Sequence, residues 1–96
     1  MSNKNQKVID KLNGLLADYQ IYYQNLRGLH WNVKGAMFFS LHEKYEEFYN
    51  VAAEVIDEIA ERILMLDGQP LHTFGDYLKN AGLKEVSNVS GGKEGV

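Results

Sequence analysis

The sequence predicts an all-α protein, an antiparallel hairpin of two long helices followed by a short third helix. Apolar residues recur at steps of three and four through two long segments, at about residues 8–32 and 37–67. A short connection between them forces the second helix to run back along the first. We expect one small domain over residues 1–96, with a polar N-terminal tail at 1–6 and a flexible C-terminal tail at 87–96.

The first long helix is predicted from Val8 to about Asn32. Gly14 and Gly28 lie inside it, and because glycine lowers helix stability we expect them to serve close backbone packing. Gly35 provides a stop signal just beyond the last periodic residue. The apolar face of this helix is formed by Val8, Leu12, Leu15, Tyr19, Tyr22, Leu26 and Leu29.

The second long helix, from about Met37 to Asp67, carries two adjoining apolar stripes. The first is Phe38, Leu41, Tyr45, Phe48, Ala52, Val55, Ile59 and Ile63, and the second is Phe39, Tyr49, Ala53, Ile56, Ala60 and Leu64. One neighbouring helix covers only one stripe, so we expect further helices or another subunit on the other. Gly68 and Pro70 end this helix, and Thr73 with Asp76 predicts the capped start of a short helix to Ala81.

Composition narrows the classes of function. A formal net charge of −3 argues against a basic nucleic-acid-binding surface. Lys4, Lys7 and Lys11 could still contact DNA phosphates, the alternative being an ordinary solvated terminus. The absence of cysteine leaves carboxylates and imidazoles as metal ligands. No apolar run is long enough to span a membrane and no signal segment is present, so we expect a cytoplasmic protein without a membrane partner, with the nucleoid as an alternative location.

Two acidic residues point to a cation site. Asp57 and Glu61 are four residues apart on one helix face, where like charges repel by about 0.2–0.5 kcal/mol. Neither has a lysine or arginine three or four residues away. A solvated acidic face is the ordinary interpretation of such a pair, but its position on an otherwise apolar segment favours a bound cation.

The histidines on either side of the hairpin bend complete the candidate ligand set. His30 precedes the bend and His42 follows it, so we expect the two imidazoles to face each other. The alternative is a hydrogen-bonded core histidine. Imidazole together with carboxylate suits iron, zinc or manganese. His72, beside Pro70, has no acidic partner nearby in sequence, and we expect it on the surface.

The distance along the second helix determines whether the four candidate ligands can meet within one chain. His42 and Asp57 are 15 residues apart on one helix, a rise of about 22 Å. One chain cannot place both on one metal ion. If two copies of the second helix cross antiparallel about a twofold axis, the histidine end of one lies beside the acidic end of the other. We therefore expect a homodimer with two equivalent sites.

Three motifs carry a family resemblance: LHWNVKG at 29–35, Leu41-His42, and DEIAER at 57–62. This combination closely resembles the Dps family, the miniferritins named for DNA-binding proteins from starved cells. The resemblance implies an inter-subunit ferroxidase site, with His30 and His42 from one subunit and Asp57 and Glu61 from its neighbour. It also implies that Trp31 intercepts oxidising equivalents beside the centre, the alternative being an indole that packs at a helix end.

The implied activity is oxidation of ferrous iron, preferably by hydrogen peroxide, with ferric mineral stored inside a shell of twelve subunits and DNA protected from oxidative damage. Larger ferritins use a Glu-x-x-His pair within one bundle. Leu64 stands three residues after Glu61, where the histidine of such a pair would be, so the sequence lacks that intra-subunit centre. The resemblance covers Val8 to Val86, the first half of a ferritin-like four-helix bundle, so we expect a truncated domain whose ferroxidase activity depends on dimer assembly. The alternative is an inactive helical hairpin that serves as an oligomerisation or interaction module.

Overall fold

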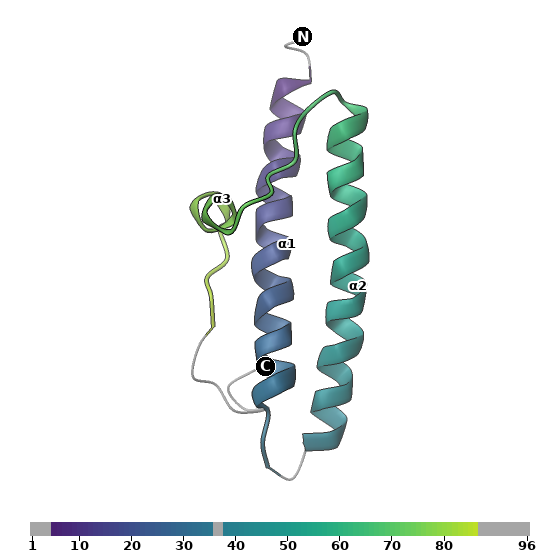
Figure 1. Cartoon of the computed structure of the whole chain (residues 1–96), viewed down its shortest axis with the longest axis vertical. Helices are drawn as coiled ribbons and strands as arrows, with labels where there is room; N and C mark the ends of the chain where they lie inside the picture. The colour runs from purple at the N-terminus through teal and green to yellow at the C-terminus, as the bar shows by residue number, and fades with distance from the viewer. Residues whose placement is uncertain (1–4, 36–37, 87–96) are drawn as a thin grey trace.

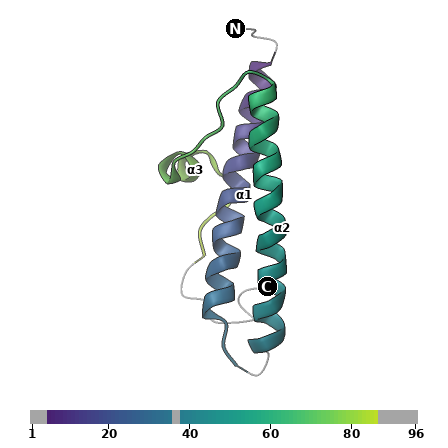
Figure 2. The same cartoon turned by 45° about the vertical axis from the view of Figure 1, so that its right-hand side comes forward.

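Three helices form the part of the chain that the structure describes, residues 5–35 and 38–86. In this computed structural model they are α1 (Gln6–Asn32), α2 (Phe38–Met65) and α3 (Phe74–Asn80). α1 and α2 lie antiparallel along their lengths, and α3 packs against α1 on the side away from α2 (Figures 1 and 2). The predicted all-α hairpin with a short third helix is confirmed. The predicted C-terminal tail, Met37 and most of the N-terminal tail lie outside the described residues.

The start of α1 differs from the prediction. The helix begins at Gln6, two residues before Val8, so the predicted polar tail at 1–6 ends too late. The Gln6 side-chain amide donates to the Asp10 carboxylate at 2.7 Å, one helical turn away. Such i,i+4 bonds stabilise a first turn, and here the bond extends the helix into polar sequence.

The end of α2 is a Schellman motif, formed with a residue other than the predicted glycine. Asp67 has a φ of 66° and occupies the left-handed position. The Gly68 amide donates to the Ile63 carbonyl at 2.9 Å, and the Asp67 amide to the Leu64 carbonyl at 3.0 Å. Gly68 is instead required because its backbone lies close to Ile9 of α1. A Cβ at residue 68 would lie 2.9 Å from the Ile9 side chain.

Two apolar clusters hold the hairpin together. One lies at the end of the hairpin far from the bend and consists of Ile9, Leu16, Ile59 and Ile63. The other lies beside the bend and consists of Leu26, Leu29, Val33 and Tyr45. The expectation that Gly14 and Gly28 serve close packing is wrong, since a Cβ at either position would meet nothing within 4 Å.

Part of the second apolar stripe of α2 remains exposed within the described chain, although Tyr49 and Ile56 pack against the two clusters. Phe39 is 83 % exposed and Leu64 60 % exposed, and Ala53 is exposed between them. On the other flank of α2, Phe48 and Val51 are exposed as well. α1 therefore covers most of the first stripe, Phe48 excepted, and leaves part of the second stripe exposed. None of the described helices combines the length and the apolar character that crossing a membrane requires.

Polar side chains on α1 fasten the segment that follows α2. Asn13 accepts from the Leu71 amide at 2.9 Å and donates to the Gln69 carbonyl. Asp18 accepts from the amides of Gly82 and Leu83, and Asn25 bonds the main chain at residues 84 and 86. The Thr73 hydroxyl accepts from the Asp76 amide at 3.1 Å, which confirms the predicted cap of α3. The segments before and after α3 are thus tied to α1 by hydrogen bonds to their backbone.

Replacing Asp18 with alanine should loosen the segment after α3 without unfolding the hairpin. One Asp18 oxygen accepts from the Gly82 amide at 2.6 Å and from the Leu83 amide at 3.2 Å. We expect a loss of about 1–2 kcal/mol in protection of residues 82–86, because hydrogen bonds to a charged acceptor are lost at a partly exposed site. Amide hydrogen exchange measures this, with Asp10→Ala as the control. Unchanged exchange at residues 82–86 would show that the Asp18 carboxylate does not hold this segment in place.

Candidate metal centre

The two histidines beside the bend form a reciprocal pair. His30 is at the end of α1 and His42 near the start of α2, and their rings stack with centroids 3.6 Å apart and planes 21° from parallel. The His30 Nδ1 lies 2.6 Å from the His42 carbonyl oxygen, and the His42 Nδ1 lies 2.7 Å from the His30 carbonyl oxygen. The predicted convergence of the two imidazoles is confirmed.

These hydrogen bonds determine the tautomer of each ring. A carbonyl oxygen can only accept, so Nδ1 of both histidines must carry the proton. In the neutral imidazole the lone pair is then on Nε2, the nitrogen that can bind a metal. A ligand histidine whose other nitrogen donates to a backbone carbonyl is the usual arrangement in metal sites. In both rings Nε2 is therefore the nitrogen whose lone pair could bind a metal ion.

Glu46 extends this pair, and the sequence reasoning did not identify it. Its Oε1 lies 4.0 Å from Nε2 of His30, which is itself only 6 % exposed. Glu46 is one helical turn after His42, so the two share a face of α2. The His42-x-x-x-Glu46 spacing was the available signal, but the charged neighbours Glu43, Lys44 and Glu47 made Glu46 resemble a solvated residue.

The two predicted acidic ligands lie elsewhere. Asp57 and Glu61 are exposed on α2, well beyond the bend. Across residues 5–35 and 38–86, no group of three or more histidine, aspartate or glutamate side chains is close enough to hold a metal ion. The described chain thus brings together His30 and His42, with Glu46 beside them, and leaves Asp57 and Glu61 apart.

His42, Glu46, Asp57 and Glu61 nevertheless share one side of α2. Steps of three and four residues connect the histidine end to the acidic end, so the positions form one continuous stripe along the helix. The stripe contains His42, Glu46, Tyr49, Ala53, Asp57, Ala60, Glu61 and Leu64. It overlaps the second apolar stripe, which α1 leaves partly exposed.

Trp31 and His72 lie outside the histidine pair. The Trp31 side chain is 57 % exposed, and the Arg27 guanidinium lies over its ring at 4.8 Å from the centroid. Trp31 therefore does not join either buried cluster of the hairpin. His72 is exposed, as predicted, and its Nδ1 lies 3.1 Å from the Pro70 carbonyl oxygen.

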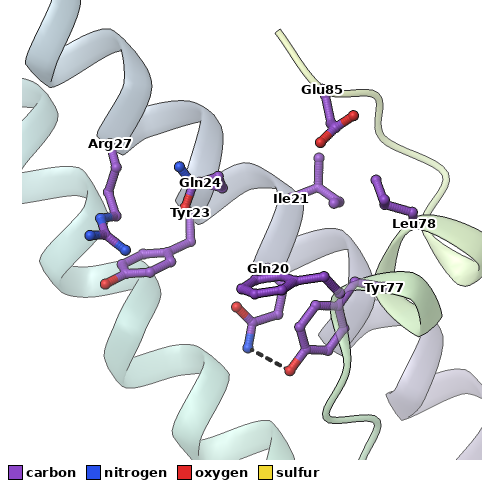
Figure 3. A pocket seen from close by; sticks show the side chains of 9 residues that line it. Gln20, Ile21, Tyr23, Gln24, Arg27, Tyr77, Leu78 and Glu85 are labelled. Atoms are coloured by element: carbon purple, nitrogen blue, oxygen red, sulfur yellow. Dashed lines mark hydrogen bonds between the residues drawn. The ribbon is translucent and has the colours of Figure 1, made fainter.

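A separate cleft of about 240 Å³ lies between α1 and α3 (Figure 3). The Gln20 amide donates to the Tyr77 hydroxyl at 3.3 Å across it, and Tyr23 and Arg27 line its other end. Burial raises the pKa of Tyr77 above the usual tyrosine value, the Gln20 bond lowers it, and the Asp76 carboxylate raises it further. The lining of the cleft includes one positively charged side chain, that of Arg27, and several aromatic rings, but no histidine. The cleft therefore differs chemically from the candidate metal centre.

Comparison with known proteins shows what the chain is similar to. The ferritin-like domain family matches residues 9–92. A DNA protection during starvation protein from Porphyromonas gingivalis is 59 % identical over 78 residues, covering 81 % of this chain and 49 % of the relative. The chain thus spans about half the length of this relative.

Solved structures show the same similarity. A Dps protein from Vibrio cholerae, described as a member of the ferritin-like diiron-carboxylate superfamily, matches with a TM-score of 0.93 and 48 % identity, over 95 % of this chain and 57 % of that one. A Dps protein from Bacillus brevis matches with a TM-score of 0.90 and 38 % identity, over 99 % and 64 %.

Replacing His42 with alanine should destabilise the metal-free hairpin. The change removes one of the two reciprocal hydrogen bonds and the ring contact, and it leaves the His30 carbonyl without its donor. We expect a loss of about 1–2 kcal/mol in the free energy of unfolding. Chemical denaturation in the presence of a chelator measures it. His72→Ala is the matched control and should have little effect. Equal stability of both variants would contradict a stabilising role for the reciprocal hydrogen bonds of His30 and His42.

Proposed function

Because this chain belongs to the ferritin-like family, among the Dps proteins, we propose that it binds and oxidises ferrous iron at a site shared between two copies, with hydrogen peroxide as the preferred oxidant. His30 and His42 of one copy hold the ion together with Asp57 and Glu61 of the other. Glu46 lies beside His30 and adds a carboxylate on the histidine side. The supporting observation is that both imidazoles are fixed with Nε2 as the nitrogen that can bind a metal, while the described residues of one chain bring no complete ligand set together.

The shared stripe on α2 supports the two-copy arrangement. His42 lies at one end of this stripe and Asp57 and Glu61 lie at the other. The midpoint between these ends falls near residue 50, so an antiparallel crossing of two α2 helices there brings each histidine end to the partner's acidic end. The exposed Phe39 and Leu64 lie on the same stripe, and their burial would favour the dimer.

The donor set suits ferrous iron. Two neutral imidazoles with the carboxylates of Asp57 and Glu61 balance the charge of a divalent ion, and Glu46 adds one further negative charge nearby. Such mixed nitrogen and oxygen sets bind iron, zinc and manganese, so the latter two can act as surrogates. The ferrous ion is a substrate that must enter, react and leave as ferric product. Partly exposed carboxylates at the subunit boundary allow this exchange.

Peroxide consumption then protects DNA indirectly. Two ferrous ions, one peroxide and two protons give two ferric ions and two water molecules, so no hydroxyl radical is released. We propose that Trp31, exposed next to His30 in sequence, intercepts oxidants that escape. Assembly beyond the dimer into a twelve-subunit shell, and direct contact with DNA through Lys7 and Lys11, would add storage and localisation. The cytoplasm is the compartment that fits this role.

Asp57→Asn and Glu61→Gln should each abolish most of the peroxide-dependent oxidation of ferrous iron. We expect a loss of tenfold or more, at the lower end of the roughly 10–100-fold effects known for metal sites, with helix content unchanged because both residues are exposed. Absorbance of the ferric product measures the rate.

Glu58→Gln is the matched control, since Glu58 is equally exposed but lies off the shared stripe. Wild-type rates in both site variants would refute the proposed ligands. Calorimetry that detects no ferrous binding to the wild-type chain would favour the interaction module.

A further inference from the structure

The hairpin has a second exposed apolar face, on the side opposite the shared stripe of α2. In two antiparallel right-handed helices, the residues that come just before the facing residues lie on the same side of the pair. On α1, Leu15 comes just before the buried Leu16. On α2, Val51 comes just before the buried Ala52, and Ala53 of the shared stripe follows on the other side. We call this side the open face, and its exposed apolar side chains, each between 40 % and 57 % exposed, are Val8, Leu15, Tyr22, Phe48 and Val51.

A hollow on α1 opens into the open face. Its volume is about 280 Å³, and it is lined by Leu15, Asp18, Tyr19 and Tyr22 of α1 and by Leu83 of the segment after α3. The Asp18 carboxylate already accepts from the Gly82 and Leu83 amides. The remaining walls are the apolar parts of leucine and tyrosine side chains. The hollow therefore suits an apolar side chain from another helix.

An exposed apolar side chain of α2 lies at the same level along the hairpin. The two apolar clusters set the levels, since residues 9 and 16 pack with 59 and 63, and residues 26 and 29 pack with 45. Residues 15–22 of α1, which line the hollow, therefore lie beside about residues 50–57 of α2. Val51 lies in this range and is 57 % exposed. It emerges on the same side as the hollow of its own chain and does not line it.

We propose that the open faces of two copies of this chain pack together, related by a twofold axis parallel to the helices. A half-turn about such an axis keeps the level and the direction of every helix, and it places α1 of each copy antiparallel beside α2 of the other. Val51 of each copy then enters the hollow of the other. The product is a four-helix bundle built from two hairpins, and burial of the exposed apolar side chains stabilises it.

The position of the hollow selects this axis over the alternative. A twofold axis perpendicular to the helices would place α1 against α1 and α2 against α2, so each hollow would face a hollow and Val51 would face Val51. Only the parallel axis pairs each hollow with an apolar side chain. Because one face carries both halves of the contact, a second copy satisfies both at once.

Charges on the open face agree with this pairing. Lys11 comes one turn before Leu15, and Glu58 comes just before the buried Ile59. Both are exposed, and neither forms an ion pair within the described part of the chain. Lys11 lies at the level of about residue 61, within one turn of Glu58, so each Lys11 approaches the partner's Glu58. Arg62, four residues after Glu58, is at the spacing for pairing within its own helix, and a carboxylate can accept from both cations.

The experiment uses the full chain, which has no cysteine of its own. Tyr22→Cys chains and Val51→Cys chains are mixed with a chelator present and oxidised mildly, and covalent dimers are measured by mass spectrometry. The mixture should give a covalent dimer of one chain of each kind, because the two positions lie at one level on neighbouring helices. Each variant alone should not, because two copies of one position lie across the bundle from each other.

Ala53→Cys is the matched control for Val51→Cys, since it is exposed on the opposite side of the same helix. Mixed with Tyr22→Cys it should give no covalent dimer. A mixture of Tyr22→Cys and Val51→Cys that stays monomeric although circular dichroism shows both chains folded, or efficient linking of Tyr22→Cys to itself, overturns the proposal. The shared metal site uses the opposite face, so either result leaves the proposed function standing.

A charge exchange tests the register of the same pairing. Lys11→Glu added to the Tyr22→Cys chain should slow formation of the mixed dimer by roughly threefold, because exposed ion pairs contribute little each. Glu58→Lys added to the Val51→Cys chain should restore the rate, since the pair is then re-formed with its charges exchanged. A rate that falls further in the doubly exchanged mixture overturns the proposed register.

Discussion

The stiffness of α2 is the constraint on which this account depends. A helix holds residues 42 and 57 about 22 Å apart, and no change of rotamer closes such a gap. The hairpin therefore separates the two imidazoles from Asp57 and Glu61, although His42, Asp57 and Glu61 share one side of α2. Any metal site that uses both pairs must form between chains. In the proposed function, each hairpin therefore supplies half of the ligands of a shared site.

The two reciprocal hydrogen bonds between His30 and His42, here called the clasp, stabilise the hairpin and also orient the two candidate ligands. Each Nδ1 hydrogen-bonds the backbone of the opposite helix, which ties α1 to α2 beside the bend. The same two bonds leave Nε2 as the ligand nitrogen of both rings. In the proposed site the clasp therefore pre-organises two of the ligands before any ion arrives, and the rotamer entropy of both side chains is lost on folding instead of on binding.

Much of the fold could be predicted from the sequence because helical periodicity is a local property. The two long helices, the Thr73 cap and the convergence of His30 and His42 follow from spacing and a short bend. Features that depend on contacts between distant residues could not be predicted. Glu46 became a candidate only when its carboxylate was found near His30, and Gly68 owes its role to Ile9, almost sixty residues earlier. The ends of the helices shifted because the Gln6 side chain and the Asp67 backbone amide form local hydrogen bonds that periodicity does not reveal.

Mixing two inactive variants tests the shared site most directly. In a dimer of one His42→Ala chain and one Asp57→Asn chain, one site carries both defects and the other carries none. Random exchange of subunits should therefore restore about a quarter of the wild-type ferrous oxidation rate, since half of the dimers are mixed and each has one intact site of two. A mixture that stays as inactive as its components, although mass spectrometry shows that the subunits have exchanged, would contradict a site built from two chains.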